Sequence, residues 1–176
     1  MTEPREPCWE KTLTVADVAE TQELARSIGA DLRAGDLLVL TGGLGAGKTT
    51  FTQGLGESLG VREGIISPTF VLMRIHPSLR GGPDLVHVDA YRLSSAGELD
   101  DLDLESTLAR SVTVVEWGAG KVEQLSDSRL EITLSRAAGQ GIGSELIFDF
   151  EELDAEEPRT VHVAGYGPRW DGIQPG

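Results

Sequence analysis

The feature that most constrains the fold of this chain is a glycine-rich run at residues 42–49, which reads G-G-L-G-A-G-K-T. It matches the pattern G-x-x-x-x-G-K-[ST]. An apolar run at residues 37–40 precedes it and is typical of a buried strand, and residues 49–59 have a composition that suits a helix. Because a strand and a helix bracket the motif, a glycine-rich turn with chance spacing is a much weaker interpretation. The order of strand, loop and helix predicts a phosphate-binding loop.

Such a loop binds a nucleoside triphosphate mainly through its backbone. Glycines let the chain wrap closely around phosphate oxygens, and the free N–H groups at the start of the helix attract them. The pattern assigns the Lys48 ammonium to the β- and γ-phosphates and the Thr49 hydroxyl to Mg²⁺. The residues expected to contact the nucleotide are Gly43, Leu44, Gly45, Ala46, Gly47, Lys48, Thr49 and Thr50.

Two further apolar segments end in a carboxylate. Residues 85–89 end in Asp89, and residues 112–116 end in Glu116. Ligands of open α/β sheets bind at the carboxyl ends of the strands, so either acid could lie beside the phosphates. One would hold the metal and the other would orient or deprotonate the attacking water, and the sequence leaves open which does which. We therefore predict Lys48, Asp89 and Glu116 as catalytic residues, and Thr49, Asp89 and Glu116 as metal ligands.

Three other positions allow two interpretations each. Residues 67–70 read S-P-T-F, so the hydroxyl of Ser67 or Thr69 could meet the metal or the γ-phosphate as part of a switch-like segment. From spacing alone a plain Ser-Pro turn is favoured. His87 is interpreted as a satisfied core histidine in preference to a catalytic one. Trp117 is interpreted either as core filler or as a residue close to the nucleotide.

The composition limits the class of protein and its partners. The 176 residues include 29 acidic and 15 basic side chains, which gives a formal net charge of −14. That charge weighs against direct nucleic-acid binding, which needs a basic face. Cys8 is the only cysteine, and neither a signal-peptide core nor an apolar run of membrane-spanning length is present. We therefore expect a cytoplasmic protein that acts through protein partners and not at a membrane.

The expected fold class is α/β, a single P-loop NTPase domain with a mixed, mainly parallel central sheet flanked by helices. A turn at residues 77–84 is too short for a helical crossover, so its flanking strands should be antiparallel. The expected strands are 9–13, 37–41, 70–75, 85–89, 112–117 and 160–164, with a hairpin made of 129–135 and 145–150. The expected helices are 49–59, a stretch within 94–110, and one that follows a capping box at Thr14–Asp17 and runs to about Arg33.

The domain boundaries follow from composition. We assign residues 1–150 to the P-loop domain, with residues 1–8 as a loose start. Residues 151–176, acidic and then rich in Gly and Pro, are expected to form a C-terminal extension whose last part, 165–176, is at most partly ordered. Within the predicted helix 49–59, Gly54 and Gly56 suggest close packing on the sheet.

The class of triphosphate enzyme can be narrowed by what the chain lacks. It contains no asparagine, so the Asn-Lys-x-Asp motif that reads guanine is absent and ATP is the favoured nucleotide. The twelve arginines are scattered, and no Arg-rich segment suggests the lid of a small-molecule kinase.

Four motifs in a fixed order carry a resemblance to a known family. They are G-A-G-K-T-T-F at 45–51, S-P-T-F at 67–70, H-V-D-A-Y-R-L at 87–93 and V-E-W at 115–117. Together they resemble the bacterial TsaE (YjeE) family, the ATPase of tRNA threonylcarbamoyladenosine biosynthesis. The similarity covers about residues 14–150. The chain departs from the family at Gly43, where Asp or Asn is common, and at Asp103, where Gly is expected.

The resemblance implies a specific division of roles. Lys48 and its loop would hold the phosphates of ATP, Thr49 and Glu116 would hold Mg²⁺, Asp89 would be a second essential acid, and residues 67–70 would form the switch-like segment. The resemblance also implies docking on the proteins TsaD and TsaB, which transfer the threonylcarbamoyl group to tRNA, with the ATP cycle resetting that complex. The tRNA itself would not be bound strongly by this chain. A small P-loop kinase and a non-hydrolysing, nucleotide-dependent scaffold remain as alternatives.

Overall fold

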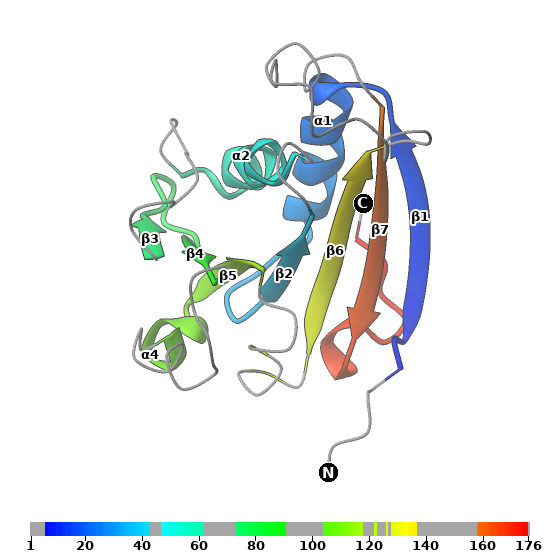
Figure 1. Ribbon diagram of the computed structural model, residues 1–176. Coiled ribbons are helices and arrows are strands. Elements are labelled where there is room, and N and C mark those ends of the chain that lie inside the picture. Colours follow the sequence, from blue (N-terminus) through cyan, green and yellow to red (C-terminus); the bar gives the residue numbers. More distant parts are fainter. Residues whose placement is uncertain are drawn as a thin grey trace.

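A computed structural model describes residues 6–42, 47–61, 73–90, 104–117, 122, 126, 128–136 and 158–175 (Figure 1). Its strands are β1 (Trp9–Val15), β2 (Leu37–Thr41), β3 (Met73–His76), β4 (Asp84–Asp89), β5 (Ser111–Glu116), β6 (Arg129–Arg136) and β7 (Arg159–Tyr166). The helices are α1 (Val18–Gly29), α2 (Lys48–Leu59) and the short α4 (Leu104–Leu108), and the 3-10 turn η2 spans Pro168–Trp170.

These strands form one seven-stranded sheet in the order β1-β7-β6-β2-β5-β4-β3. The pairs β6–β2, β2–β5 and β5–β4 are parallel, whereas β3–β4, β6–β7 and β7–β1 are antiparallel. Because β1 is antiparallel to β7 and β7 to β6, five of the seven strands point the same way. The predicted mixed, mainly parallel α/β sheet is confirmed, and so is the antiparallel pair on either side of the turn at 77–84.

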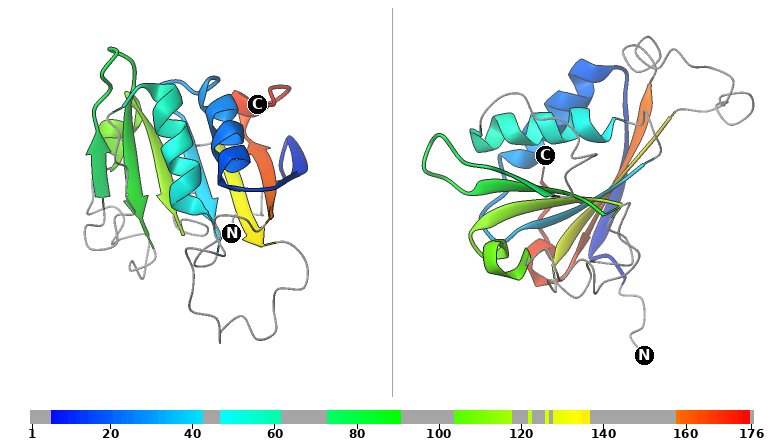
Figure 2. Two further views of the ribbon diagram at one scale, coloured as in Figure 1. Left: turned by 90° about the horizontal axis from the view of Figure 1, so that it is seen from above. Right: turned by 60° about the vertical axis from the view of Figure 1, so that its left-hand side comes forward.

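The two faces of the sheet are covered by different helices. Helices α1 and α2 lie side by side on one face, and α4 lies on the other (Figure 2). Alternate residues of β2 accordingly enter different clusters: Leu38 and Leu40 pack with the α1–α2 side, and Leu37 and Val39 pack with the α4 side. All six residues of β5 are buried, which is the pattern of a central strand covered on both faces.

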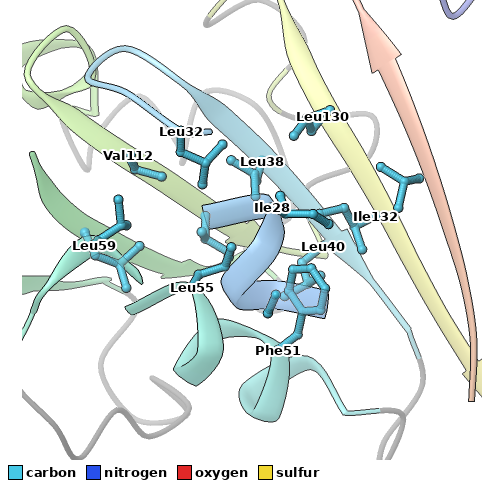
Figure 3. Packing of buried hydrophobic residues seen from close by; sticks show 14 of the residues in the cluster. Ile28, Leu32, Leu38, Leu40, Phe51, Leu55, Leu59, Val112, Leu130 and Ile132 are labelled. Carbon is cyan, nitrogen blue, oxygen red and sulfur yellow. The ribbon is translucent and has the colours of Figure 1, made fainter. Parts of the chain in front are cut away.

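The core on the α1–α2 side contains most of the large buried side chains. Figure 3 shows them between the two helices and the sheet. Ile28 of α1 and Phe51 and Leu55 of α2 have no exposed surface, and they meet Leu40 of β2 and its neighbours. This packing fixes α2, and with it the first residues after the phosphate-binding loop, against the ends of the central strands.

Helix α1 begins at Val18, as predicted, but it ends before the predicted Arg33 and its cap differs from the predicted one. Its N-cap is Asp17, whose Oδ1 accepts from the backbone N–H of Glu20 at 2.9 Å, while the Glu20 carboxylate accepts from the N–H of Ala16. The capping box therefore pairs Asp17 with Glu20, and the predicted pairing of Thr14 with Asp17 is wrong. The α-helical part ends at Gly29, because the N–H groups of residues 31 and 32 donate to carbonyls three residues back. Leu32 nevertheless packs in the core, as its helical spacing suggested.

Gly54 of α2 makes a close contact with helix α1. A Cβ on Gly54 would lie 2.7 Å from both the Ala25 Cβ and the Gln22 carbonyl oxygen, so Gly54 packs against α1. The expected contact of Gly54 with the sheet is therefore wrong. A similar contact is made from α1, since a Cβ on Gly29 would lie 2.7 Å from the Ser58 Cβ. Close approach of the two helix backbones is thus the reason for glycine at both positions.

The predicted partner of the 129–135 strand is also wrong. β6 pairs antiparallel with β7 and parallel with β2, so its hairpin-like partner is the segment 159–166. The predicted partner 145–150 lies outside the described residues. β7 occupies an interior position between β1 and β6, and its residues Val161 and Val163 are fully buried. Residues 159–166 of the expected C-terminal extension are therefore built into the sheet.

The residues after β7 are also tied to the domain. Trp170 has no exposed surface, and its carbonyl oxygen accepts from Trp9 Nε1 at 2.8 Å. The Arg169 guanidinium donates from Nε to Asp36 Oδ1 at 2.9 Å and from NH2 to the Asp31 carbonyl at 2.9 Å. Residues in the segment 165–175, which was predicted to be at most partly ordered, thus contact β1 and the segment that follows α1.

The longest described helices, α1 and α2, have 12 residues each. No helix in the described part of the chain is long and apolar enough to cross a membrane.

Candidate functional site

The predicted site residues converge where three parallel strands end. β2 leads into the phosphate-binding loop, and its neighbour β5 ends at Glu116, which is in register with Leu40 of β2. On its other side, Glu116 is in register with Asp89 at the end of β4. The alignment continues past the strands, because the N–H of Ala90 donates to the Glu116 carbonyl at 2.9 Å. The two predicted acids are therefore neighbours at one edge of the sheet.

Both acids lie on the face of the sheet that α2 covers. Paired residues of adjacent strands project to the same face, and successive residues alternate between faces. Leu40 belongs to the cluster that contains α2, whereas Val88 and Val115 belong to the opposite cluster. Glu116 and Asp89 must then project toward α2. Burial leaves only 3% of Glu116 and 9% of Asp89 exposed.

The described start of α2 has a glycine with a left-handed backbone as its N-cap. Gly47 is the N-cap, with φ of 103°, and its carbonyl accepts from the N–H of Phe51 at 2.9 Å. Among the described residues, no atom lies within 4 Å of a Cβ built on Gly47, so its positive φ is the reason for glycine there. No side chain in the described part of the chain caps the helix, and its first N–H groups point toward the end where the loop lies.

Lys48 is held beside the acids. Its side chain is buried, and Nζ donates to the Gly42 carbonyl oxygen at 2.6 Å. Burial lowers the pKa of Lys48, and the negative charges of Glu116 and Asp89 act in the opposite direction. The cation and the two carboxylates therefore occupy one electrostatic site.

Trp117 adds an aromatic face to the site. Its ring centroid lies 4.5 Å from Lys48 Nζ, and its backbone N–H donates to the Leu40 carbonyl at 3.0 Å. Its φ is 62°, the sole positive value at a non-glycine position in the described part of the chain. A bulky residue in this region is strained by about 1–3 kcal/mol, and such strain is concentrated at functional sites. Trp117 is only partly buried and lies over Lys48, so it does not merely fill the core, and its closeness to the nucleotide stays a prediction.

His87 contributes a contact that the sequence interpretation missed. It is fully buried, and its Nε2 lies 2.5 Å from Glu116 Oε2. The interpretation as a core histidine described its burial but not its partner. The alternation in residues 85–89 held the clue, because a residue two before Asp89 must project to the same face as the two acids.

The donor set at this edge fits Mg²⁺. Mg²⁺ prefers oxygen ligands and usually takes only one or two carboxylates, with phosphates and water completing its shell. Glu116 and Asp89 supply carboxylates, and Thr49 supplies a hydroxyl from the first turn of α2. The described residues contain no group of three or more His, Cys, Asp or Glu side chains that could hold a metal by themselves. The arrangement suits a metal shared with a nucleotide.

Some predicted positions lie outside the described residues. These are the loop residues Gly43, Leu44, Gly45 and Ala46, the switch-like residues Ser67 and Thr69, and Asp103. Thr50 lies in the first turn of α2, beside Thr49.

Comparisons with known proteins point to one family. The family model described as Threonylcarbamoyl adenosine biosynthesis protein TsaE matches residues 15–142. A Streptomyces coelicolor protein named tRNA threonylcarbamoyladenosine biosynthesis protein TsaE is 54% identical over 150 residues, which cover 85% of this chain and 93% of that protein. A Bacillus subtilis protein of the same name is 40% identical over 119 residues, covering 67% and 73%. The crystal structure of Bacillus subtilis YdiB is similar with a TM-score of 0.68 at 28% identity, covering 94% and 91%.

Proposed function

The chain belongs to the TsaE family, as its four motifs predicted, and on this premise we propose that it binds and hydrolyses ATP with Mg²⁺ as an accessory protein of tRNA threonylcarbamoylation. Its relatives carry names that assign them to threonylcarbamoyladenosine biosynthesis, and the chain takes part in the same pathway. We further propose that it acts by docking on TsaD and TsaB in the cytoplasm.

The observation that carries the proposal is the convergence of one buried cation and two buried carboxylates at the start of α2. Lys48 begins the helix, Glu116 and Asp89 are register partners on the strands beside it, and all three are at least nine-tenths buried. Burying unlike charges together is costly unless the site has a further partner or a chemical use. A Mg²⁺–triphosphate complex supplies such a partner, because it brings both a cation and anionic oxygens.

Each residue has a role in hydrolysis. The backbone N–H groups at the start of α2 and the Lys48 ammonium bind the phosphates and stabilise the charge that develops as the γ-phosphoryl group leaves. Thr49 and Glu116 would hold Mg²⁺, which would supply positive charge against the charge of the triphosphate. Asp89 orients the attacking water. The water oxygen bonds to the γ-phosphorus, the bond from that phosphorus to the β–γ bridging oxygen breaks, and the water proton passes to a carboxylate or to the phosphate product.

The charge of the chain supports a role that depends on protein partners. A net charge of −14 repels the phosphates of tRNA, so the pathway's RNA substrate is better held by other components. We therefore propose that TsaD and TsaB hold the tRNA, and that this chain binds them and not the RNA.

The test is ATP hydrolysis by the purified chain, alone and mixed with TsaD and TsaB. Lys48→Ala should abolish the partner-stimulated turnover. A matched control is Lys11→Ala, because Lys11 also donates to a backbone carbonyl, that of Pro175 at 3.1 Å, but lies on edge strand β1. Stimulation that survives Lys11→Ala and is lost in Lys48→Ala supports the proposal.

Two other outcomes would contradict it. Turnover that rises with a small metabolite and not with the two proteins would indicate a kinase. A Glu116→Ala variant that binds nucleotide, does not hydrolyse it and still supports full tRNA modification would indicate a non-hydrolysing scaffold.

A further inference from the structure

We propose that His87 is a positioning residue that fixes the Glu116 carboxylate, so that one oxygen is held by the imidazole and the other would be left for a metal ion. The inference rests on the proposed function, since it assigns a task to the contact between His87 and a residue proposed to hold the metal. It concerns orientation only, through a hydrogen bond from the ring.

The contact is between two strands and is fully enclosed. His87 Nε2 and Glu116 Oε2 are 2.5 Å apart, with His87 0% and Glu116 3% exposed. The register partner of His87 is Val114, two residues before Glu116, so the hydrogen bond runs diagonally along one face of β4 and β5. A buried bond of this kind is not weakened by competition from bulk water.

The hydrogen-bonding chemistry assigns the roles of the two partners. An ionised carboxylate only accepts hydrogen bonds, so the imidazole must donate from Nε2 to Oε2. With Oε2 engaged, rotation of the Glu116 carboxylate is restricted, and Oε1 is the oxygen left for other partners. Residues that hydrogen-bond a metal ligand in this way orient it and tune its affinity for the metal.

The competing interpretation is that His87 merely fills the core. This interpretation does not explain why a ring with a second nitrogen, Nδ1, that has no partner in the described part of the chain occupies a buried position. His87 Nδ1 is buried without a hydrogen-bond partner among the described residues. A buried polar atom without a partner opposes folding, so an apolar residue of similar volume would fill the same space at lower cost. Retaining a histidine here makes physical sense if its Nε2 contact with Glu116 has a use.

The experiment measures how Mg²⁺ changes ATP affinity, with His87→Leu removing the donor and His87→Gln restoring an N–H donor. Binding of a fluorescent ATP analogue is titrated with Mg²⁺ and with a chelator. We expect His87→Leu to reduce the Mg²⁺-dependent gain in affinity by roughly 10- to 100-fold, as for other partners of metal ligands, and His87→Gln to recover most of it. Affinity without Mg²⁺ should be unchanged, because the loop and Lys48 still bind the phosphates.

A double-mutant cycle separates positioning from general damage. In a Glu116→Gln background, His87→Leu should have little further effect on the Mg²⁺ dependence, because both changes act on the same ligand. The matched control is His76→Leu: His76 Nε2 is also buried without a partner among the described residues, but the residue lies on edge strand β3. His76→Leu should keep the full Mg²⁺ effect.

The outcomes distinguish this inference from the proposed function. If the unmodified chain shows no Mg²⁺-dependent ATP binding, the proposed function fails and the inference fails with it. Suppose instead that the unmodified chain shows Mg²⁺-dependent ATP binding. If His87→Leu then keeps the full Mg²⁺ dependence, or loses ATP affinity equally with and without Mg²⁺, only the positioning role of His87 is overturned. If His87→Leu does not fold, the decision is made with His87→Gln, alone and combined with Glu116→Gln. Near-normal Mg²⁺ dependence of ATP binding in His87→Gln alone supports the positioning role. Loss of that Mg²⁺ dependence in His87→Gln contradicts the positioning role.

Discussion

Replacing Gly54 with alanine sets the helix propensity of α2 against its contact with α1. In an exposed helix interior, alanine is favoured over glycine by about 1 kcal/mol. At Gly54, the new Cβ would lie 2.7 Å from the Ala25 Cβ, 2.7 Å from the Gln22 carbonyl oxygen and 3.1 Å from the Gln22 Cα. Two of these three atoms belong to the backbone of α1, so only movement of a whole helix can relieve the contacts.

The magnitude follows from the balance of the two effects. Overpacking a well-filled interior costs about 1–3 kcal/mol, and contacts with backbone belong at the upper end of that range. After subtracting the propensity gain, we expect Gly54→Ala to lower the free energy of unfolding by about 1–2 kcal/mol. The helix that moves is the one that begins with Lys48, so weaker ATP binding should accompany the loss of stability.

Urea unfolding of Gly54→Ala gives the free energy, with an unchanged slope as the sign that the folded state remains compact. The control is a pair at Ser27, an exposed position of α1, where Ser27→Ala should exceed Ser27→Gly in stability by about 1 kcal/mol from propensity alone. If Gly54→Ala is as stable as the unmodified chain or more so, the close α1–α2 contact does not decide this position and the reasoning is refuted.

Three further predictions concern other parts of the fold. Gly60→Ala should lower the free energy of unfolding in urea by about 1–2 kcal/mol, because Gly60 has φ of +72° and a Cβ there would lie 2.0 Å from Arg80 Nε. Adding Arg80→Ala removes the clash but not the unfavourable φ, so it should restore only part of the loss. Gly60→Ala with the stability of the unmodified chain would contradict this prediction. A chain truncated after Pro158 lacks β7 and the buried Trp170, so it should show no cooperative unfolding by circular dichroism; a sharp transition would show that the sheet does not need β7. Burial lowers the pKa of His76 below its usual 6.5, so the unfolded chain binds a proton more readily and the free energy of unfolding should fall as pH drops through 6.5. Urea unfolding at pH 7 and pH 5 should therefore show a smaller fall in free energy for His76→Leu than for the unmodified chain. An equal fall in both chains would count against this prediction.

The sequence by itself determined the elements whose signals are local. The G-x-x-x-x-G-K-[ST] pattern placed Lys48 at the start of a helix, and the apolar runs that end in Asp89 and Glu116 became neighbouring parallel strands. These predictions succeeded because a glycine-rich loop, a buried strand and a strand-end acid are each specified by a few consecutive residues. The four motifs likewise identified the family correctly.

Only the tertiary structure decided which distant residues meet. By its sequence, strand 129–136 could have paired with any nearby apolar segment. In the structure it pairs with 159–166, and that strand also pairs with β1 on its other side. Gly54 was correctly interpreted as a site of close packing, but its neighbour is α1 and not the sheet. The contact of His87 with Glu116 depends on the register of two strands, and a register is set by the whole sheet and not by either strand alone. Local patterns specify the type of each element, whereas contacts between elements depend on the complete packing of the chain.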